Sequence, residues 1–265
     1  MRFTFLGTGT SSGIPVIGCA CEVCTSDDAR DARLRTSACL EFTDAGGQDR
    51  TILIDAGPDL RQQVLRHGMS RLDAILFTHN HVDHTWGLDE VRRFNVVQEA
   101  PIDVYGDART MRDLRRVYAH IFDRHLNVQK SFVADLIAHE IDLQPFDLYG
   151  VRFTPIRLLH GRLPVLGFRI DADAPWAPLA YCTDVSAIPP ESWSILDGVE
   201  TLVLDALRRR HHPTHFTLDQ AVDAASRIGA PRTLLIHMTH DLGHVATNEE
   251  LPEGIELAWD GLTLS

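Results

Sequence analysis

Short apolar runs recur along the chain and predict a series of β-strands. Each run is rich in aliphatic or aromatic residues and is bounded by turn-forming or charged residues, which is typical of strands in a folded core. The predicted strands span residues 2–6, 38–42, 51–54, 74–77, 151–156, 167–170, 179–182, 201–204 and 233–236. The sequence Asp-Ala-Gly-Gly at residues 44–47 predicts a tight turn that joins two of them.

Helical spacing of apolar residues occurs in fewer segments. Residues 58–67 begin with a proline, which the first helical position tolerates, and precede Gly68, a favourable residue just after a helix. Apolar residues also keep helical spacing at residues 111–121 and 218–228. The second of these follows a capping-box sequence, Thr-Leu-Asp-Gln, at residues 217–220.

Strands outnumber helices in this pattern, and the helices lie between strands along the chain. This arrangement favours a layered α/β sandwich over a helical bundle or an all-β fold. The sequence has no internal repeat or linker, so we expect one domain over residues 1–265. Residues 119–145 show the least pattern, and we expect them to run over the surface.

The charge balance limits the classes of partner. The chain has 25 Lys and Arg residues against 37 Asp and Glu residues, a formal net charge of −12. This disfavours broad binding to nucleic acid or to an anionic membrane, although a bound metal can still attract a small phosphorylated substrate. Residues 1–7 read as a strand rather than a signal peptide, and no run approaches the roughly 18 apolar residues of a membrane span. We therefore expect a cytoplasmic protein.

Ionisable residues follow five of the predicted strands. They stand at or just beyond the strand end, where polar residues either mark the exit from the core or build a site at a sheet edge. Because the pattern repeats on five strands, we interpret it as a site. The residues are Asp55, His79, Asp184, Asp205 and His237.

The strongest local motif is His-Asn-His-Val-Asp-His at residues 79–84. It places four metal-ligand side chains within six residues, directly after a predicted strand. Histidine nitrogen and aspartate oxygen together suit zinc, manganese or iron. The motif can be divided between two ions, with His79 and His81 on one and Asp83 and His84 on the other.

Two ions need further ligands, and three residues are placed to supply them. His160 follows the strand predicted at 151–156, while Asp184 and His237 follow two later strands. A carboxylate such as Asp184 can bridge two cations and hold them roughly 3.5–4 Å apart, the separation used in two-metal hydrolysis.

Three cysteines predict a separate metal site. Cys19, Cys21 and Cys24 crowd a short loop, and a structural tetrahedral zinc needs one more ligand. His240 lies three residues after His237, so a short turn can direct the two histidines to different sites. The remaining cysteines, Cys39 and Cys182, lie in apolar strands and are expected to be plain core residues.

The motif at residues 79–84, followed in order by His160, Asp184 and His237, resembles the metallo-β-lactamase superfamily. The resemblance implies an αββα sandwich with a dinuclear metal site at one edge. It implies that His79, His81 and His160 hold one metal, that Asp83, His84 and His237 hold the other, and that Asp184 bridges them. It also implies that Asp55 is the buried aspartate that orients the histidine loop.

One branch of the superfamily is matched further. The start at residues 7–10, the cysteine loop and the His-x-x-His at residues 237–240 resemble the phosphodiesterase of the carbon–phosphorus lyase pathway that opens 5-phosphoribosyl 1,2-cyclic phosphate. The segment at residues 119–140 looks longer than its equivalent there. The resemblance implies that His215 assists catalysis, with His212 as the alternative. Arg208 begins a basic run that could contact phosphate.

We therefore expect a phosphodiesterase that uses two zinc or manganese ions and one structural zinc to cleave a small cyclic phosphate. His215 would protonate the leaving oxygen, and a homodimer is left open. Two alternatives remain: a nuclease of the same fold that processes tRNA 3′ ends, and a carrier protein of pyrroloquinoline quinone biosynthesis. The net charge of −12 disfavours the nuclease, and the complete ligand set disfavours a protein that only binds.

Overall fold

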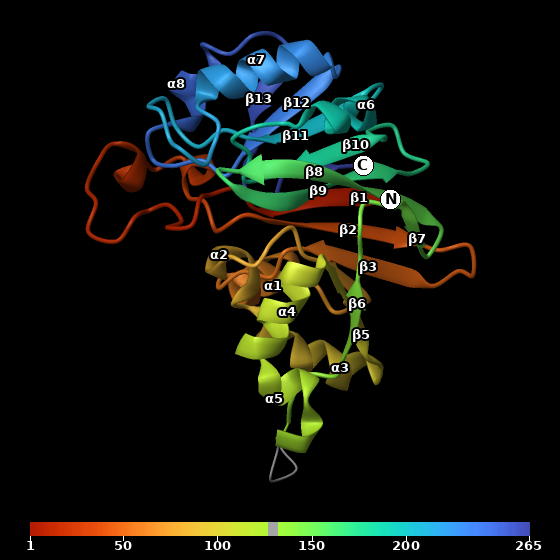
Figure 1. Ribbon diagram of the computed structural model, residues 1–265. Helices are drawn as coiled ribbons and strands as arrows, with labels where there is room; N and C mark the ends of the chain where they lie inside the picture. Colours follow the sequence, from red (N-terminus) through yellow and green to blue (C-terminus); the bar gives the residue numbers. More distant parts are fainter. Residues whose placement is uncertain (127–131) are drawn as a thin grey trace.

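Two seven-stranded sheets lie face to face in the computed structural model, which describes residues 1–126 and 132–265 (Figure 1). The first sheet has the order β14-β1-β2-β3-β4-β5-β6 and the second the order β13-β12-β11-β10-β9-β8-β7. The first comprises β1 (Arg2–Gly7), β2 (Ser37–Thr43), β3 (Asp49–Ile54), β4 (Ala74–Leu76), β5 (Ile102–Gly106), β6 (Leu136–Glu140) and β14 (Thr263–Leu264). The second comprises β7 (Phe146–Leu148), β8 (Val151–His160), β9 (Leu163–Asp171), β10 (Leu179–Cys182), β11 (Thr201–Asp205), β12 (Arg232–Ile236) and β13 (Ile255–Leu257).

Helices cover the outer faces of both sheets (Figure 1). Beside the first sheet lie α1 (Leu60–His67), α2 (Val82–Thr85), α3 (Arg92–Gln98), α4 (Ala108–Val117) and α5 (Ala119–Phe122). Beside the second lie α6 (Trp193–Leu196), α7 (Leu218–Ile228) and α8 (His244–Asn248). The predicted αββα sandwich is confirmed.

The core has three parts that follow these layers. Aromatic and aliphatic side chains from both sheets meet in the centre, where Phe3, Phe153 and Phe168 are fully buried. A second cluster packs α7 on the second sheet, and a third packs α1, α3 and α4 on the first. Burial of these apolar faces is what holds helix and sheet layers together.

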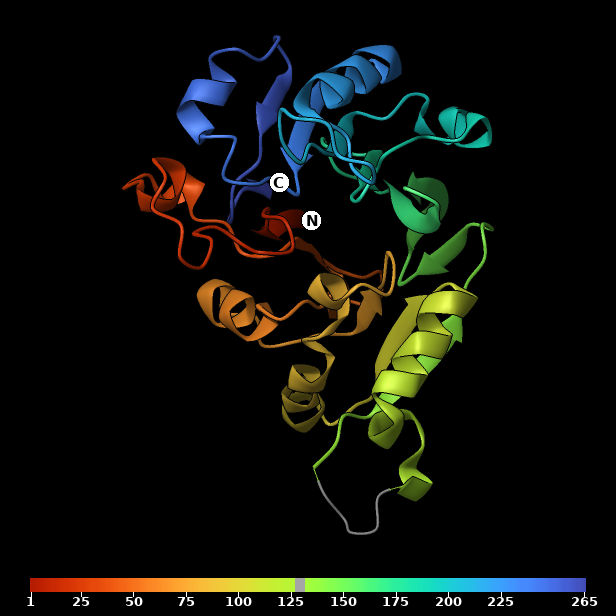
Figure 2. The ribbon, with the colours of Figure 1, turned by 60° about the vertical axis from the view of Figure 1, so that its left-hand side comes forward.

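The ends of the chain meet on the first sheet. β14 pairs with β1, with Phe3 opposite Leu264, so both views place the two termini close together (Figures 1 and 2). Among the described residues, no helix is both long enough and apolar enough to cross a bilayer.

All of the predicted strands form, and β8 runs on to His160. The strands β5, β6, β7, β13 and β14 carry no prediction, because most of them are short or only partly buried and so lack a clear apolar run. The predicted turn at 44–47 joins β2 and β3, and the Asp44 carboxylate accepts hydrogen bonds from the backbone of Gly46 and Gln48.

Two predicted helices have different bounds. The helix predicted at 58–67 begins at Leu60, and Pro58 lies in the turn before it. Asp59 precedes that helix, but its carboxylate accepts hydrogen bonds from Arg35 instead of capping the helix. The pattern at 111–121 breaks at Tyr118 into α4 and α5.

The expectation for residues 119–145 is only partly right. Within them β6 pairs with β5 in the first sheet, and Ile121 of α5 is buried in the third core cluster. Residues 127–131 of this segment lie outside the described residues.

Candidate dinuclear metal centre

The strand ends deliver the predicted residues to one edge of the sandwich. Asp55 follows β3, the motif at 79–84 follows β4, and Asp184 and His237 follow β10 and β12. Asp55, Asp184 and His237 all have positive φ angles, of 60°, 55° and 60°. Such angles are costly for residues other than glycine and persist at functional sites where the surroundings fix them.

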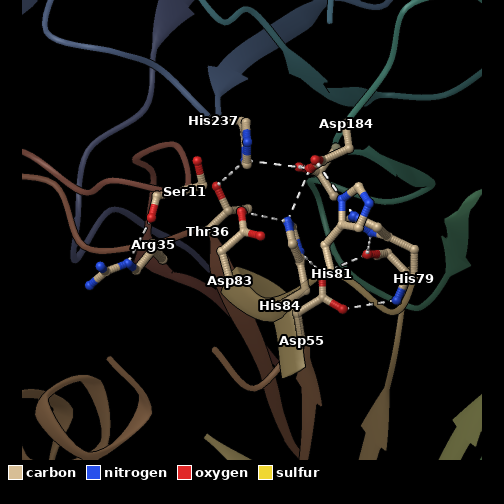
Figure 3. Close-up of polar contacts among 12 residues, drawn as sticks. Ser11, Arg35, Thr36, Asp55, His79, His81, Asp83, His84, Asp184 and His237 are labelled. Atoms are coloured by element: carbon tan, nitrogen blue, oxygen red, sulfur yellow. Dashed lines mark hydrogen bonds and ion pairs between the residues drawn. The ribbon is translucent and has the colours of Figure 1, made fainter. Parts of the chain in front are cut away.

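Three overlapping groups of possible ligand atoms converge at this edge, and two of them contain the predicted metal ligands while the third joins His215 to Asp184 and His237 (Figure 3). Within each group, one nitrogen or oxygen atom per residue lies within 4.8 Å of the others. The first group is His79, His81, His160 and Asp184, and the second is Asp83, His84 and His237. The structure thus brings together all seven residues that the sequence predicts as ligands.

Asp184 lies between the two groups. Its Oδ1 is 3.2 Å from His84 Nε2 and 3.4 Å from His237 Nδ1. Its Oδ2 is 3.7 Å from His79 Nε2 and 3.9 Å from His160 Nε2. Burial alone would raise the pKa of Asp184, but the facing histidines hold that pKa well below its usual range. The carboxylate therefore offers one oxygen to each group, as a bridging ligand must.

Asp55 orients the histidine loop from behind. Its carboxylate is fully buried, accepts hydrogen bonds from the backbone and hydroxyl of Thr78, and lies 2.7 Å from His84 Nδ1. These contacts direct His84 Nε2 toward Asp184 and fix the loop where it leaves β4. Asp55 thus has the placement that the resemblance implies, the position expected of a residue that supports a metal ligand.

Close backbone packing holds the same loop. Ala56 N–H donates to the carbonyl of His84, at 2.8 Å. A Cβ at Gly57 would lie 2.1 Å from the carbonyl oxygen of Asp83, so only glycine allows this approach.

The other histidine rings are also fixed by their Nδ1 atoms. His160 Nδ1–H donates to the carbonyl of Thr214 at 2.7 Å, which leaves Nε2 free to face the centre. His237 Nδ1 lies 3.0 Å from the Thr36 hydroxyl, which itself donates to the carbonyl of Gly9. His160 is thus held through the nitrogen that does not face the centre, as a metal-binding imidazole usually is. His237 differs, because its Nδ1 contacts both the Thr36 hydroxyl and, at 3.4 Å, Asp184 Oδ1.

These residues fit a pair of divalent cations. His79 Nε2 is buried and makes no hydrogen bond to any residue in the described ranges, which is costly unless another partner binds it. Neutral imidazoles and carboxylates form the mixed nitrogen and oxygen set that suits zinc or manganese. Burial lowers the pKa of His79 well below its usual value, which keeps its nitrogen available as a ligand.

His215 stands beside the centre and is held by Asp205, at the end of β11. Its Nδ1 lies 2.9 Å from Asp205 Oδ2, and its ring centroid lies 4.5 Å from that of His160. Burial by itself lowers the pKa of His215, but the Asp205 carboxylate outweighs burial and raises it. Burial also raises the pKa of Asp205 to about 6. The sequence places Asp205 at this edge but does not reveal it as the partner of His215.

His212, the alternative to His215, and Arg208, the predicted phosphate contact, are arranged differently. The ring centroid of His212 lies 5.1 Å from that of His215, and its Nδ1 lies 3.1 Å from the Thr214 hydroxyl. The Arg208 guanidinium donates to the carbonyls of Arg210 and His211, at 3.2 and 3.0 Å. Arg208 thus stabilises its own loop, and these bonds give no support to the predicted phosphate contact.

The cysteine cluster forms as predicted. The sulfurs of Cys19, Cys21 and Cys24 lie 3.3, 3.4 and 3.3 Å from His240 Nδ1. A hydrogen bond from the Cys24 backbone, together with the neighbouring groups, lowers the pKa of Cys21 to about 7, which favours the thiolate. Three sulfurs and one nitrogen match a structural zinc site.

The two remaining cysteines are core residues, as the sequence predicts. Cys39 and Cys182 are buried in β2 and β10. Burial raises the pKa of each thiol to about 12, so both stay protonated and unreactive at neutral pH.

A family model and a solved structure both match this chain over most of its length. The family model described as a beta-lactamase superfamily domain matches residues 50–238. The crystal structure of a new diphosphatase from the PhnP family is 40% identical to this chain, with a TM-score of 0.88, and the match covers 100% of this chain and 97% of that one.

Two curated relatives match in sequence over different lengths. An octanoyltransferase of Porphyromonas gingivalis is 38% identical over 264 residues, which are 99% of this chain and 51% of that protein. A coenzyme PQQ synthesis protein B of Methylobacterium nodulans is 35% identical over 103 residues, which are 35% of this chain and 34% of that protein. The chain thus spans about half the length of the first relative, and the match to the second covers about a third of each protein.

Proposed function

This chain belongs to the metallo-β-lactamase superfamily, in its PhnP-like branch, and from that membership we propose that it is a metal-dependent hydrolase that cleaves a phosphodiester bond in a small phosphorylated molecule. The observation that carries the proposal is the position of Asp184. One of its oxygens faces each ligand group, and His215 stands beside both. This arrangement suits a reaction in which two bound cations act on one phosphate group.

The residues that would hold the cations are divided by Asp184. His79, His81 and His160 would bind one cation, and Asp83, His84 and His237 the other, with Asp184 shared. Two cations bound there would stabilise negative charge on phosphate oxygens and lower the pKa of a water molecule. The cysteine cluster would bind a zinc that supports the fold and takes no part in the chemistry.

His215 would supply the proton for the leaving oxygen. Asp205 holds its Nδ1, so Nε2 is the atom free to face the substrate. The raised pKa of His215 increases the fraction of rings that carry a proton near neutral pH. A general acid needs both properties: a fixed direction and a proton to give.

The substrate is proposed to be small. The net charge of −12 disfavours an extended polyanion such as tRNA. A cyclic phosphodiester such as 5-phosphoribosyl 1,2-cyclic phosphate fits the resemblance to the carbon–phosphorus lyase branch. The PhnP-family diphosphatase supports a second candidate, a diphosphate, in which a phosphate is likewise the group attacked.

The octanoyltransferase and the PQQ protein give weaker guidance. The match spans 51% of the first protein and 34% of the second, so each name describes a chain that is longer than the matched part. Neither acyl transfer nor a carrier role accounts for a His215–Asp205 pair beside two groups of metal ligands.

Three substrates test the proposal. Purified protein would be loaded with manganese or with zinc and assayed on 5-phosphoribosyl 1,2-cyclic phosphate, bis-p-nitrophenyl phosphate and ADP. We expect metal-dependent hydrolysis of the cyclic ester, or of ADP if the second candidate is right, and none after chelation. Protein that binds metal but hydrolyses none of the three would contradict the proposal and favour a role in binding alone.

A further inference from the structure

The turn at residues 237–242 connects the two candidate metal sites. His237 is buried at the dinuclear centre, and His240 meets the three cysteines only three residues later. Residue 238 is fixed from the N-terminal segment, because Met238 N–H donates to Thr8 and its carbonyl accepts from Thr10. Thr239 N–H donates to the carbonyl of Leu207 at 2.8 Å, which leaves the carbonyls on either side of His240 to be held by other groups.

The side chain of Arg33 binds the two carbonyls on either side of His240. Its guanidinium donates through Nη1 to the carbonyl of Thr239 at 3.1 Å and through Nη2 to the carbonyl of Leu242 at 2.6 Å. These two carbonyls flank His240 in the sequence. A planar guanidinium can span two acceptors in one rigid arrangement, which a lysine ammonium cannot reproduce.

Burial of the charged Arg33 side chain also costs desolvation free energy. Its side chain is 0% exposed, and its charge is compensated by Asp31, whose Oδ1 lies 3.3 Å from Nη2. The same Asp31 oxygen accepts the backbone N–H of His244 at 2.8 Å, just beyond the turn. A buried ion pair contributes little net stability compared with apolar packing, so its contacts point to a role in fixing geometry.

The backbone of Arg33 contacts the base of the cysteine loop. Arg33 and Ile14 exchange two backbone hydrogen bonds of 2.8 Å each, five residues before Cys19. A Cβ at Gly9 would lie 2.9 Å from the carbonyl oxygen of Arg33, so the N-terminal strand end packs directly on it. One residue thus joins the loop that carries the thiolates to the turn that carries the histidines.

We propose that Arg33 is a positioning residue that fixes the 237–242 turn and so sets His240 against the cysteines and His237 against the dinuclear centre. Its effect on the dinuclear centre rests on the proposed function, whereas its effect on the cysteine site does not. Groups that orient metal ligands in this way typically change metal affinity or activity by roughly 10–100-fold.

The test replaces Arg33 and measures cobalt binding at the cysteine site. Arg33→Lys keeps the charge and loses the planar fork, while Arg33→Met loses both. Arg30→Gln is the matched control, because the Arg30 side chain pairs with Asp28 on the surface of the same segment. The Arg33 guanidinium contacts Arg30 through the Arg30 backbone carbonyl, which this substitution keeps. Cobalt bound to thiolates absorbs in the near ultraviolet, so its affinity is read without any assay of catalysis.

We expect the native protein and Arg33→Lys both to unfold cooperatively, and Arg33→Lys to bind cobalt at the thiolates about 10–100-fold more weakly. At saturating manganese its kcat on bis-p-nitrophenyl phosphate should fall while KM stays unchanged, and Arg30→Gln should match the native protein throughout. Native cobalt affinity in Arg33→Lys would overturn the proposal, as would loss of the entire fold in that variant. If no phosphodiester is hydrolysed, the proposed function fails and the cobalt measurement still decides the role of Arg33.

Discussion

At the scale of single residues, the site depends on which atom of each side chain is left free. Asp55, Thr214 and Asp205 each engage the Nδ1 atom of one histidine and so direct its Nε2 atom inward. His84 and His160 then serve as candidate ligands, while His215 is left to move a proton. Identical side chains thus acquire different roles from the groups behind them.

His215→Ala should distinguish acid catalysis from metal binding. The loss should be roughly 10²–10⁴-fold when the leaving group is a sugar hydroxyl, which needs a proton. It should be far smaller for nitrophenolate, which leaves readily as an anion. Steady-state kinetics on 5-phosphoribosyl 1,2-cyclic phosphate and bis-p-nitrophenyl phosphate measure the difference.

His212→Ala is the matched variant, because His212 lies in the same loop and its Nδ1 contacts Thr214. It should retain most activity on both substrates, and neither variant should lose metal. An equal loss on both substrates in His215→Ala, with metal retained, would show that His215 positions phosphate instead of donating a proton.

At the scale of elements, the candidate ligands lie in the loops that follow strands, and the pairing of the strands beneath them stabilises the fold. Thr51 in β3 donates its backbone N–H to Asp73, which also accepts from Arg50 and Arg71 just before β4. This cluster holds β3 and β4 together at the end opposite to Asp55 and the histidine loop. The cysteine loop is held at a different place, where its three sulfurs contact His240.

Asp73→Asn should reveal how much the bonds of Asp73 to Thr51, Arg50 and Arg71 contribute to stability, through the pH dependence of the free energy of unfolding. Burial alone would raise the pKa of Asp73, but the hydrogen bonds from Arg71, Thr51 and Arg50 lower it in the folded state. A carboxylate with a lowered pKa adds stability above its unfolded pKa, and that contribution is lost as pH falls through the folded value. We expect the variant to be about 1–3 kcal/mol less stable at pH 7.

The measurement is urea unfolding at several pH values, and the difference from the native protein should shrink below pH 4 or so. Asp171→Asn is the control, because Asp171 pairs with Arg169 at a more exposed position. It should change the free energy of unfolding by less than about 0.5 kcal/mol. A constant difference at all pH values for Asp73→Asn would contradict the ion-pair explanation.

Cys21→Ser tests the cysteine site. It should lower bound zinc by about one ion per chain and reduce stability by several kcal/mol, since structural zinc binding is coupled to folding. Metal analysis and thermal unfolding measure both effects. Cys182→Ser is a buried control that should leave zinc unchanged, and unchanged zinc in Cys21→Ser would show that this sulfur is not a ligand.

At the scale of the whole molecule, the sandwich assembles one edge from segments far apart in the sequence. The sequence predicts the layers and the seven candidate ligands, because apolar runs with polar ends, the motif at 79–84 and the family resemblance can all be read along the chain. It does not predict that Asp205 holds His215, or that Arg33 contacts Thr239 and Leu242, because those contacts form only on folding. The Arg33 bonds join residues more than 200 positions apart and end on backbone carbonyls, which have no sequence signature.

The sequence does not predict the short edge strands β6 and β13, for a related reason. β6 and β13 have few fully buried positions, so their residues carry little apolar pattern, and their pairing depends on the neighbouring strand. The αββα layers could be predicted without them, because the central strands supply most of the core.

Titrating metal into chelated protein shows whether hydrolysis of a small phosphodiester needs two cations shared by Asp184. Manganese would be added stepwise to the native protein and to Asp184→Asn, with bound metal and hydrolysis of bis-p-nitrophenyl phosphate measured at each step. Native activity should appear fully only when about two ions are bound at the histidine site, and folded Asp184→Asn should stay inactive. Full native activity with a single bound ion, or near-native activity in Asp184→Asn, would contradict the two-cation mechanism.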